Sequence, residues 1–106
     1  MVTPQLAYLM NDILSDGSAR WQSLGTNNVL DVGFPTAAKI GRVEDDFSAW
    51  TVGYTPERVA LVWMAANESF DPEVAAGMWH ALIKKANETL PPTGWDAPIG
   101  ITKMDV

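Results

Sequence analysis

Apolar residues near the start of the chain recur at helical spacing. Five of them fall at positions i, i+3, i+4, i+7 and i+8, which form one stripe along a helix. They are Leu6, Leu9, Met10, Ile13 and Leu14. Thr3 suits the N-cap, Pro4 suits the first helical position, and Gly17 suits the C-terminal stop. The pattern therefore predicts a helix at about residues 4–15.

Further along the chain, the spacing of apolar residues changes from the helical period to the period of two that is typical of strands. Residues 17–36 hold several Gly, Asn and Pro residues, which favours a loop-rich segment with at most short helical turns. Strands are then predicted at 36–42, 47–54 and 59–66. The second strand alternates, with Trp50, Val52 and Tyr54 on one face and Phe47, Ala49, Thr51 and Gly53 on the other.

The third predicted strand is apolar on both faces, which is typical of an interior strand covered on both sides. Short turns separate the three strands, so the sheet should be antiparallel. Asp71-Pro72-Glu73 then resembles a helix start, with Asp71 as N-cap and Pro72 at the first position. An apolar helical face follows, formed by Val74, Ala75, Met78, Trp79, Leu82, Ile83 and Ala86.

This order predicts an α+β fold in one domain, residues 1–106. An antiparallel sheet of at least three strands would be flanked by two helices, and residues 91–106 would form an extended tail. The chain has 106 residues, of which 47% are hydrophobic, enough for a globular core. Its longest apolar run is far shorter than the ~20 residues of a membrane helix.

The net charge of −6 argues against nucleic acid as a partner, because phosphates require clustered Lys and Arg. Cysteine is absent, which excludes disulfides, zinc-thiolate sites and a cysteine nucleophile. We predict no cofactor and no metal. The acidic turn Glu44-Asp45-Asp46 is better explained as a solvated turn than as a cation site. His80, the single histidine, has no second histidine to support a metal site.

Two motifs carry the candidate chemistry. The first predicted strand contains Ala37-Ala38-Lys39-Ile40-Gly41-Arg42, and the second contains Ala49-Trp50-Thr51-Val52-Gly53-Tyr54-Thr55-Pro56. With the Tyr8-containing helix, Gly25-Thr26 and Val62-Trp63-Met64, this ordered set resembles the C-terminal half of a penicillin-binding protein transpeptidase domain. The bifunctional glycosyltransferase–transpeptidases are the most similar type.

The resemblance implies part of a β-lactamase/transpeptidase-like fold and a serine acyl-transfer site. In that family, a serine in Ser-x-x-Lys attacks a D-Ala-D-Ala stem peptide or a β-lactam, and a Lys-Thr-Gly strand lines the site. By resemblance, Lys39 would attract the substrate carboxylate, and Gly41 would allow close approach of the acyl group. The implied substrate-binding residues are Lys39, Ile40, Gly41 and Arg42.

Two departures from the family pattern affect that site. Ile40 replaces the motif's hydroxyl residue, and Arg42 replaces the Thr or Ser that follows the motif; Arg42 could still bind a carboxylate through two hydrogen bonds. No Ser-x-x-Lys and no Ser-x-Asn occurs in these 106 residues. We therefore expect a fragment without a catalytic nucleophile, inactive alone, from a parent that cross-links peptidoglycan at the extracytoplasmic face of a bacterial membrane.

Other interpretations stay open. The chain could be a non-catalytic module of the same ancestry that binds peptidoglycan or a protein, or an unrelated α+β domain. Lys39 could simply protect an edge strand from aggregation. Trp50, Trp63 and Trp79 occupy core-like positions, whereas Trp21 and Trp95 lie in predicted loops and have no assigned role.

The resemblance also implies partners. The remainder of the transpeptidase domain would cover the chain and extend its sheet beyond the third strand. Without that cover, residues 59–66 would be a bare apolar edge, so we expect self-association or domain swapping through this strand.

Overall fold

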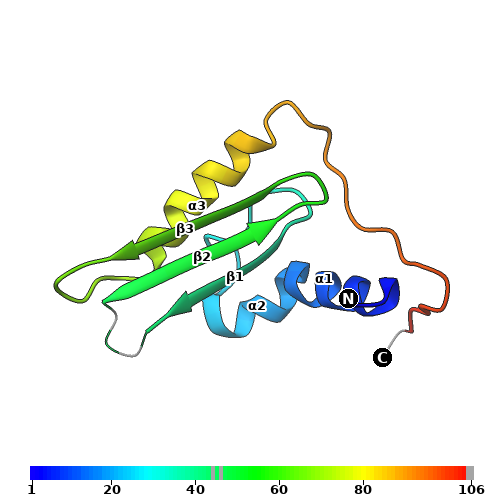
Figure 1. Cartoon of the computed structure of the whole chain (residues 1–106), viewed down its shortest axis with the longest axis horizontal. Helices are drawn as coiled ribbons and strands as arrows, with labels where there is room; N and C mark the ends of the chain where they lie inside the picture. Colours follow the sequence, from blue (N-terminus) through cyan, green and yellow to red (C-terminus); the bar gives the residue numbers. More distant parts are fainter. Residues whose placement is uncertain (44, 46, 105–106) are drawn as a thin grey trace.

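The computed structural model describes residues 1–43, 45 and 47–104. The chain begins with two helices, α1 (Pro4–Ser15) and α2 (Gly17–Leu24). Three strands follow, and helix α3 comes last; their bounds are β1 (Ala37–Arg42), β2 (Ser48–Tyr54), β3 (Val59–Ala65) and α3 (Glu73–Ala86). The predicted α+β class is therefore confirmed, with a three-stranded antiparallel sheet in the order β1-β2-β3 (Figure 1).

Helix α1 has the predicted bounds, and its cap is the predicted one. The Thr3 side chain accepts a hydrogen bond from the Leu6 N–H, and Pro4 opens the helix. The end of α1 is followed at once by α2, which the sequence did not predict. Asp16 closes α1 and caps α2, because its carboxylate accepts a hydrogen bond from the Ser18 N–H at 2.9 Å. Gly17, expected as a helix stop, is the first residue of α2.

The sheet has one face packed against α3 and one face that is largely open. In the paired register, Ala38 lies opposite Gly53, and Gly53 lies opposite Ala60, so these three residues share the α3 face. Figure 1 shows α3 crossing one face of the sheet, while α1 lies near one end of it. The predicted alternation is confirmed within β2, since Ala49, Thr51 and Gly53 are buried and the residues between them are more exposed. Phe47, predicted on the same face as these three, lies just before β2 and is exposed.

Trp79 forms the centre of the core between α3 and the sheet. Its side chain is fully buried and packs with Ile83 and Ala76 of α3, and with residues of the loop before β1. Its ring also lies against the backbone of Gly53, where a Cβ would collide with it. Trp79 therefore occupies the core position predicted for it.

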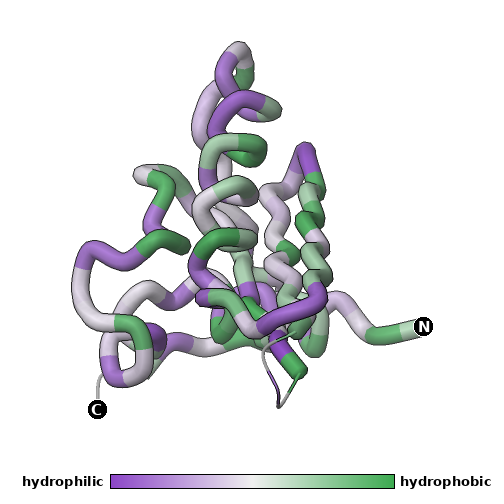
Figure 2. The backbone as a smooth tube through the Cα atoms, turned by 90° about the vertical axis from the view of Figure 1, so that its left-hand side faces the viewer, coloured by the Kyte–Doolittle hydropathy of each residue, from purple (hydrophilic) through white to green (hydrophobic). Residues whose placement is uncertain are grey.

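The predictions for Trp50 and Trp63 were wrong. Their side chains are 48% and 66% exposed, because both lie on the face of the sheet opposite α3. The prediction that β3 is covered on both faces was wrong for the same reason, since Val59 and Leu61 are also exposed on this face. In Figure 2, the strands beside α3 are partly green, that is hydrophobic, and partly pale.

Helix α3 begins one residue later than predicted. Pro72 takes the cap position, and Asp71 accepts a hydrogen bond from the Glu73 N–H. The segment after α3 is extended, as predicted, and returns to α1, where the Gln5 side chain donates to the Ile99 carbonyl at 2.8 Å. In the described part of the chain, we find no helix with the length and apolar character to cross a membrane.

Candidate functional site

Strand β1 lies at one edge of the sheet, and this position decides where its four predicted site residues point. Its pairing with β2 is antiparallel, and the Val43 N–H donates to the Ser48 carbonyl at 3.2 Å. Because hydrogen-bonded pairs alternate in such a ladder, the backbone groups of Lys39 and Gly41 point toward β2. Those of Ile40 point to the outer edge, away from β2.

The side chains alternate in the same way. Lys39 and Gly41 lie on the open face of the sheet, with Val52 and Trp50 of β2 opposite them. Ile40 and Arg42 lie on the α3 face. Lys39 is exposed, and its Nζ lies 3.5 Å from the Ile40 carbonyl oxygen. Because that carbonyl points outward, the contact brings the ammonium group to the free edge of β1.

A groove of about 410 Å³ lies beside this edge. Three of the four predicted residues line it, namely Lys39, Ile40 and Arg42. Helix α2 forms the opposite side, and the start of α3 closes one end through Asp71 and Glu73. The groove thus combines basic groups from the sheet and α2 with two carboxylates from the start of α3. It has the dimensions and the polar groups to hold a short peptide or a carboxylate.

Ile40 has a structural role in this groove. Its side chain is half-buried and packs against the hydrophobic core, at a position where a hydroxyl group would meet apolar neighbours. Gly41 does not line the groove. A Cβ at Gly41 would collide with the indole of Trp50, so the glycine makes room for that ring on the open face.

Arg20 is a groove residue that the sequence interpretation did not identify. One of its terminal nitrogens donates to the Leu14 carbonyl at 3.1 Å, and the other lies 3.5 Å from the Asp31 carboxylate. Asp31 also accepts a hydrogen bond from the Asn28 N–H. The guanidinium therefore joins α1, α2 and the following loop, and it fixes the wall of the groove. The sequence signal for α2, the helix that carries Arg20, was Asp16 as an N-cap before Ser18. Gly17 at the first position of the helix obscured that signal.

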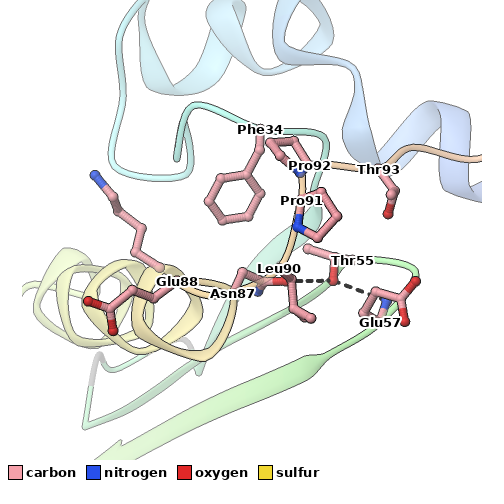
Figure 3. Close-up of a pocket in the computed structure, with 10 residues that line it drawn as sticks. Phe34, Thr55, Glu57, Asn87, Glu88, Leu90, Pro91, Pro92 and Thr93 are labelled. Carbon is pink, nitrogen blue, oxygen red and sulfur yellow. Dashed lines mark hydrogen bonds between the residues drawn. The ribbon is translucent and has the colours of Figure 1, made fainter.

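A second hollow, of about 420 Å³, lies between the end of α3 and the C-terminal segment (Figure 3). It contains none of the four predicted residues. The Thr55 hydroxyl donates to the Asn87 side chain at 3.1 Å and accepts from the Glu57 N–H at 3.2 Å. These bonds join the β2–β3 turn to the end of α3, so this hollow is a structural junction.

The other residues considered from the sequence lie apart from the groove. His80 is half-buried, and its Nδ1 lies 2.7 Å from the Val29 carbonyl oxygen, so it anchors the loop before β1 to α3. Among the described residues, no group of three possible metal ligands is found. Of the acidic turn, Glu44 and Asp46 lie outside the described residues. Trp21, predicted in a loop, lies in α2 and is exposed. Trp95 packs edge-on against Tyr54 with ring centroids 5.8 Å apart.

Comparison with known proteins identifies relatives along nearly the whole chain. It is 32% identical to penicillin-binding protein 1A of Clostridium acetobutylicum over 109 aligned positions, covering 98% of this chain and 13% of that protein. It is 26% identical to penicillin-binding protein 1A of Clostridium novyi over 108 positions, covering 100% of this chain and 12% of that protein. No protein-family profile and no solved structure matches the chain. The predicted resemblance to penicillin-binding proteins is therefore confirmed, and the chain spans about one-eighth of the length of these relatives.

Proposed function

We propose that this chain, as a relative of a segment of penicillin-binding proteins, supplies the peptide-binding strand of a transpeptidase-like site in peptidoglycan synthesis. The observation that carries this proposal is the outer edge of β1, which among the described residues pairs with no further strand and lies beside a groove of about 410 Å³. An extended peptide can add to such an edge as a further strand, with main-chain hydrogen bonds for affinity and side-chain contacts for specificity.

In this proposal, a stem peptide lies along β1 and pairs with the outward backbone groups of Ile40. The Lys39 ammonium, already near the Ile40 carbonyl, attracts the terminal carboxylate of the peptide. Arg42, which lines the same groove, adds positive charge at the far end of the strand. The site would act on the outer side of the cytoplasmic membrane, where peptidoglycan is assembled.

The chain binds and does not itself form the acyl-enzyme. Its 106 residues hold no Ser-x-x-Lys, and Ile40 stands where the family's motif has a hydroxyl residue. Full transpeptidation would require the nucleophile from another segment, on the same polypeptide or on a partner. A non-catalytic peptidoglycan-binding module is the second candidate, and the packing of Ile40 against the core favours it, because the strand is stable without the hydroxyl.

Calorimetric titration with a soluble peptide ending in D-Ala-D-Ala tests the binding step. We expect weak, saturable binding that Lys39→Ala weakens by roughly tenfold to a hundredfold, since a charge-assisted hydrogen bond contributes roughly 1.5–3 kcal/mol. Lys103→Ala is the matched control, because Lys103 is an exposed lysine outside the groove, and it should bind like the unmodified chain. Equal binding by both variants would contradict the assignment of Lys39.

Covalent labelling tests the chemical step and separates the two candidates. Alone, the chain should form no stable adduct with a fluorescent penicillin. If an upstream segment bearing Ser-x-x-Lys restores labelling when it is joined to the chain, the transpeptidase site is supported. Peptide binding without labelling in either form would favour the binding module.

A further inference from the structure

Residues 91–101, named the strap, follow α3 and run back to α1 (Figure 1). Pro91 and Pro92 have no backbone N–H, so neither can continue a helix, and the strap starts as extended chain. Both prolines line the hollow that also contains the ring of Phe34, which lies in the loop before β1 (Figure 3). The first residues of the strap therefore lie beside the segment that leads into the edge strand.

The next strap residues flank the first residue of β1. That residue, Ala37, is fully buried, and Tyr54 lies directly opposite it in the ladder. Trp95 packs edge-on against the Tyr54 ring, with ring centroids 5.8 Å apart. Pro35 precedes Ala37 by two residues, and a Cβ at Gly94 would touch the Pro35 ring at 3.6 Å. Two adjacent strap residues thus contact the neighbours of Ala37 in the ladder and in the chain.

The far end of the strap is anchored on α1. The Ile101 N–H donates to the Pro98 carbonyl at 3.3 Å, and Gly100 has a φ of +100°, so these residues form a turn. The Ile99 carbonyl in this turn accepts a hydrogen bond from the Gln5 side chain at 2.8 Å. A residue with a Cβ is strained at this φ, so the anchor depends on Gly100.

The strap is held by few contacts. In the described part of the chain, it pairs with no strand and makes a single hydrogen bond to other segments, the one from Gln5. Its other contacts are between rings and apolar groups. A segment with few hydrogen bonds and little buried surface opens at a much lower free-energy cost than the core. The strap can therefore detach while the β1–β2 ladder and α3 stay folded.

We propose that the strap holds the first residues of β1 in place and thereby regulates the order of the peptide-binding edge. When it is closed, Ala37 is supported through Tyr54 and through Pro35, and Ile40 follows three residues later. When it is open, both supports are lost, and the start of an edge strand paired on one side alone frays. The hold on β1 is independent of the proposed function, whereas the regulation of peptide binding rests on it.

Native-state hydrogen exchange tests the hold on β1 without any peptide. The N–H groups of Ala37, Lys39 and Gly41 all face β2 and lie at increasing distance along the strand from Trp95. Trp95→Ala should speed exchange about tenfold at Ala37, less at Lys39 and not at Gly41, because the aromatic pair is lost at one end of the strand. The α3 amides should exchange as in the unmodified chain.

A second variant acts at the other end of the strap. Gly100→Ala strains the turn that anchors Ile99 and should give the same gradient along β1, with a smaller amplitude. Thr102→Ala is the matched control, since Thr102 is exposed and lies just beyond the strap, and it should leave exchange unchanged. Equal acceleration in β1 and α3 would mean general destabilisation and would overturn the proposal. So would an unchanged Ala37 amide in a Trp95→Ala chain whose strap is digested faster.

Calorimetric titration with a peptide ending in D-Ala-D-Ala tests the regulatory step. Trp95→Ala should weaken binding severalfold, because apparent affinity falls with the fraction of chains whose edge is ordered. If the exchange gradient appears and the unmodified chain binds no peptide, the hold on β1 is supported and the proposed function fails, together with its regulation. If the unmodified chain and Trp95→Ala bind the peptide equally despite the gradient, the strap does not regulate the site.

Discussion

Two glycines on opposite faces of the sheet make a matched pair for mutation. Each lies in a paired strand position beneath a tryptophan, and a Cβ at either would collide with the ring above it. Gly53 lies under Trp79, which is fully buried, and its Cβ would also come within 2.8 Å of the Ala37 carbonyl oxygen. Gly41 lies under Trp50, which is 48% exposed.

The difference in burial sets the expected magnitudes. In Gly53→Ala neither the buried ring nor the backbone carbonyl can move freely, so overpacking should lower the free energy of unfolding by about 3 kcal/mol. In Gly41→Ala the Trp50 ring can rotate into solvent. Replacing glycine also lowers the conformational entropy of the unfolded chain, which stabilises the fold by roughly 0.5–1 kcal/mol and offsets the cost of that movement. The net change should lie within about 1 kcal/mol of zero.

Urea unfolding followed by tryptophan fluorescence and by far-UV circular dichroism measures both variants at one protein concentration. Thermal unfolding should show the same ranking, with a shift of about 4–8 °C for each kcal/mol in a domain of this size. If Gly53→Ala proves as stable as Gly41→Ala, the close packing of Trp79 on β2 is wrong. Gly53→Ala should cost less in a Trp79→Leu background than in the unmodified chain, because the smaller side chain leaves room for the added Cβ.

Further predictions concern the groove wall, the C-terminal segment and covalent labelling by penicillin. Arg20→Met should lower the free energy of unfolding by about 1–3 kcal/mol, because Asp31 loses a partly buried partner; urea unfolding measures this. Tyr54→Phe removes the 2.6 Å hydrogen bond to the Asn11 side chain and should cost about 1 kcal/mol by the same assay. Trp95→Ala should speed proteolysis of the C-terminal segment and leave the core melting transition nearly unchanged, as limited digestion would show. Gel fluorescence after incubation with a labelled penicillin should show no covalent band for the chain alone.

The sequence predicted α1, α3 and the three strands, which have strong local signals, and missed α2. The apolar stripe and the Thr3–Pro4 cap located α1, and the alternation of β2 identified which of its residues share a face. The sequence could not show which faces are covered, because Trp50 and Trp63 have the same apolar character as the buried Trp79. Whether a face of the sheet is buried depends on which elements of the chain pack against it, and the spacing of apolar residues does not show this.

The sequence motif identified the candidate site, but it predicted only part of the site's geometry. Lys39, Ile40 and Arg42 line one groove, but the sequence did not indicate that Ile40 packs into the core while its backbone faces outward. Arg20 joins the groove through long-range contacts that local patterns do not reveal. The short helix α2 was hidden by a glycine at its first position, which local propensity treats as a break.

Amide chemical shifts during titration with a D-Ala-D-Ala peptide test the central claim, that a peptide adds to the outer edge of β1. The Ile40 N–H points outward, and the neighbouring Gly41 N–H points toward β2, so the two amides form an internal control. Binding along the edge predicts a large downfield shift and slowed hydrogen exchange at Ile40, with a much smaller change at Gly41. Saturable binding that leaves the Ile40 amide unchanged, or that shifts only residues outside the groove, would contradict the claim.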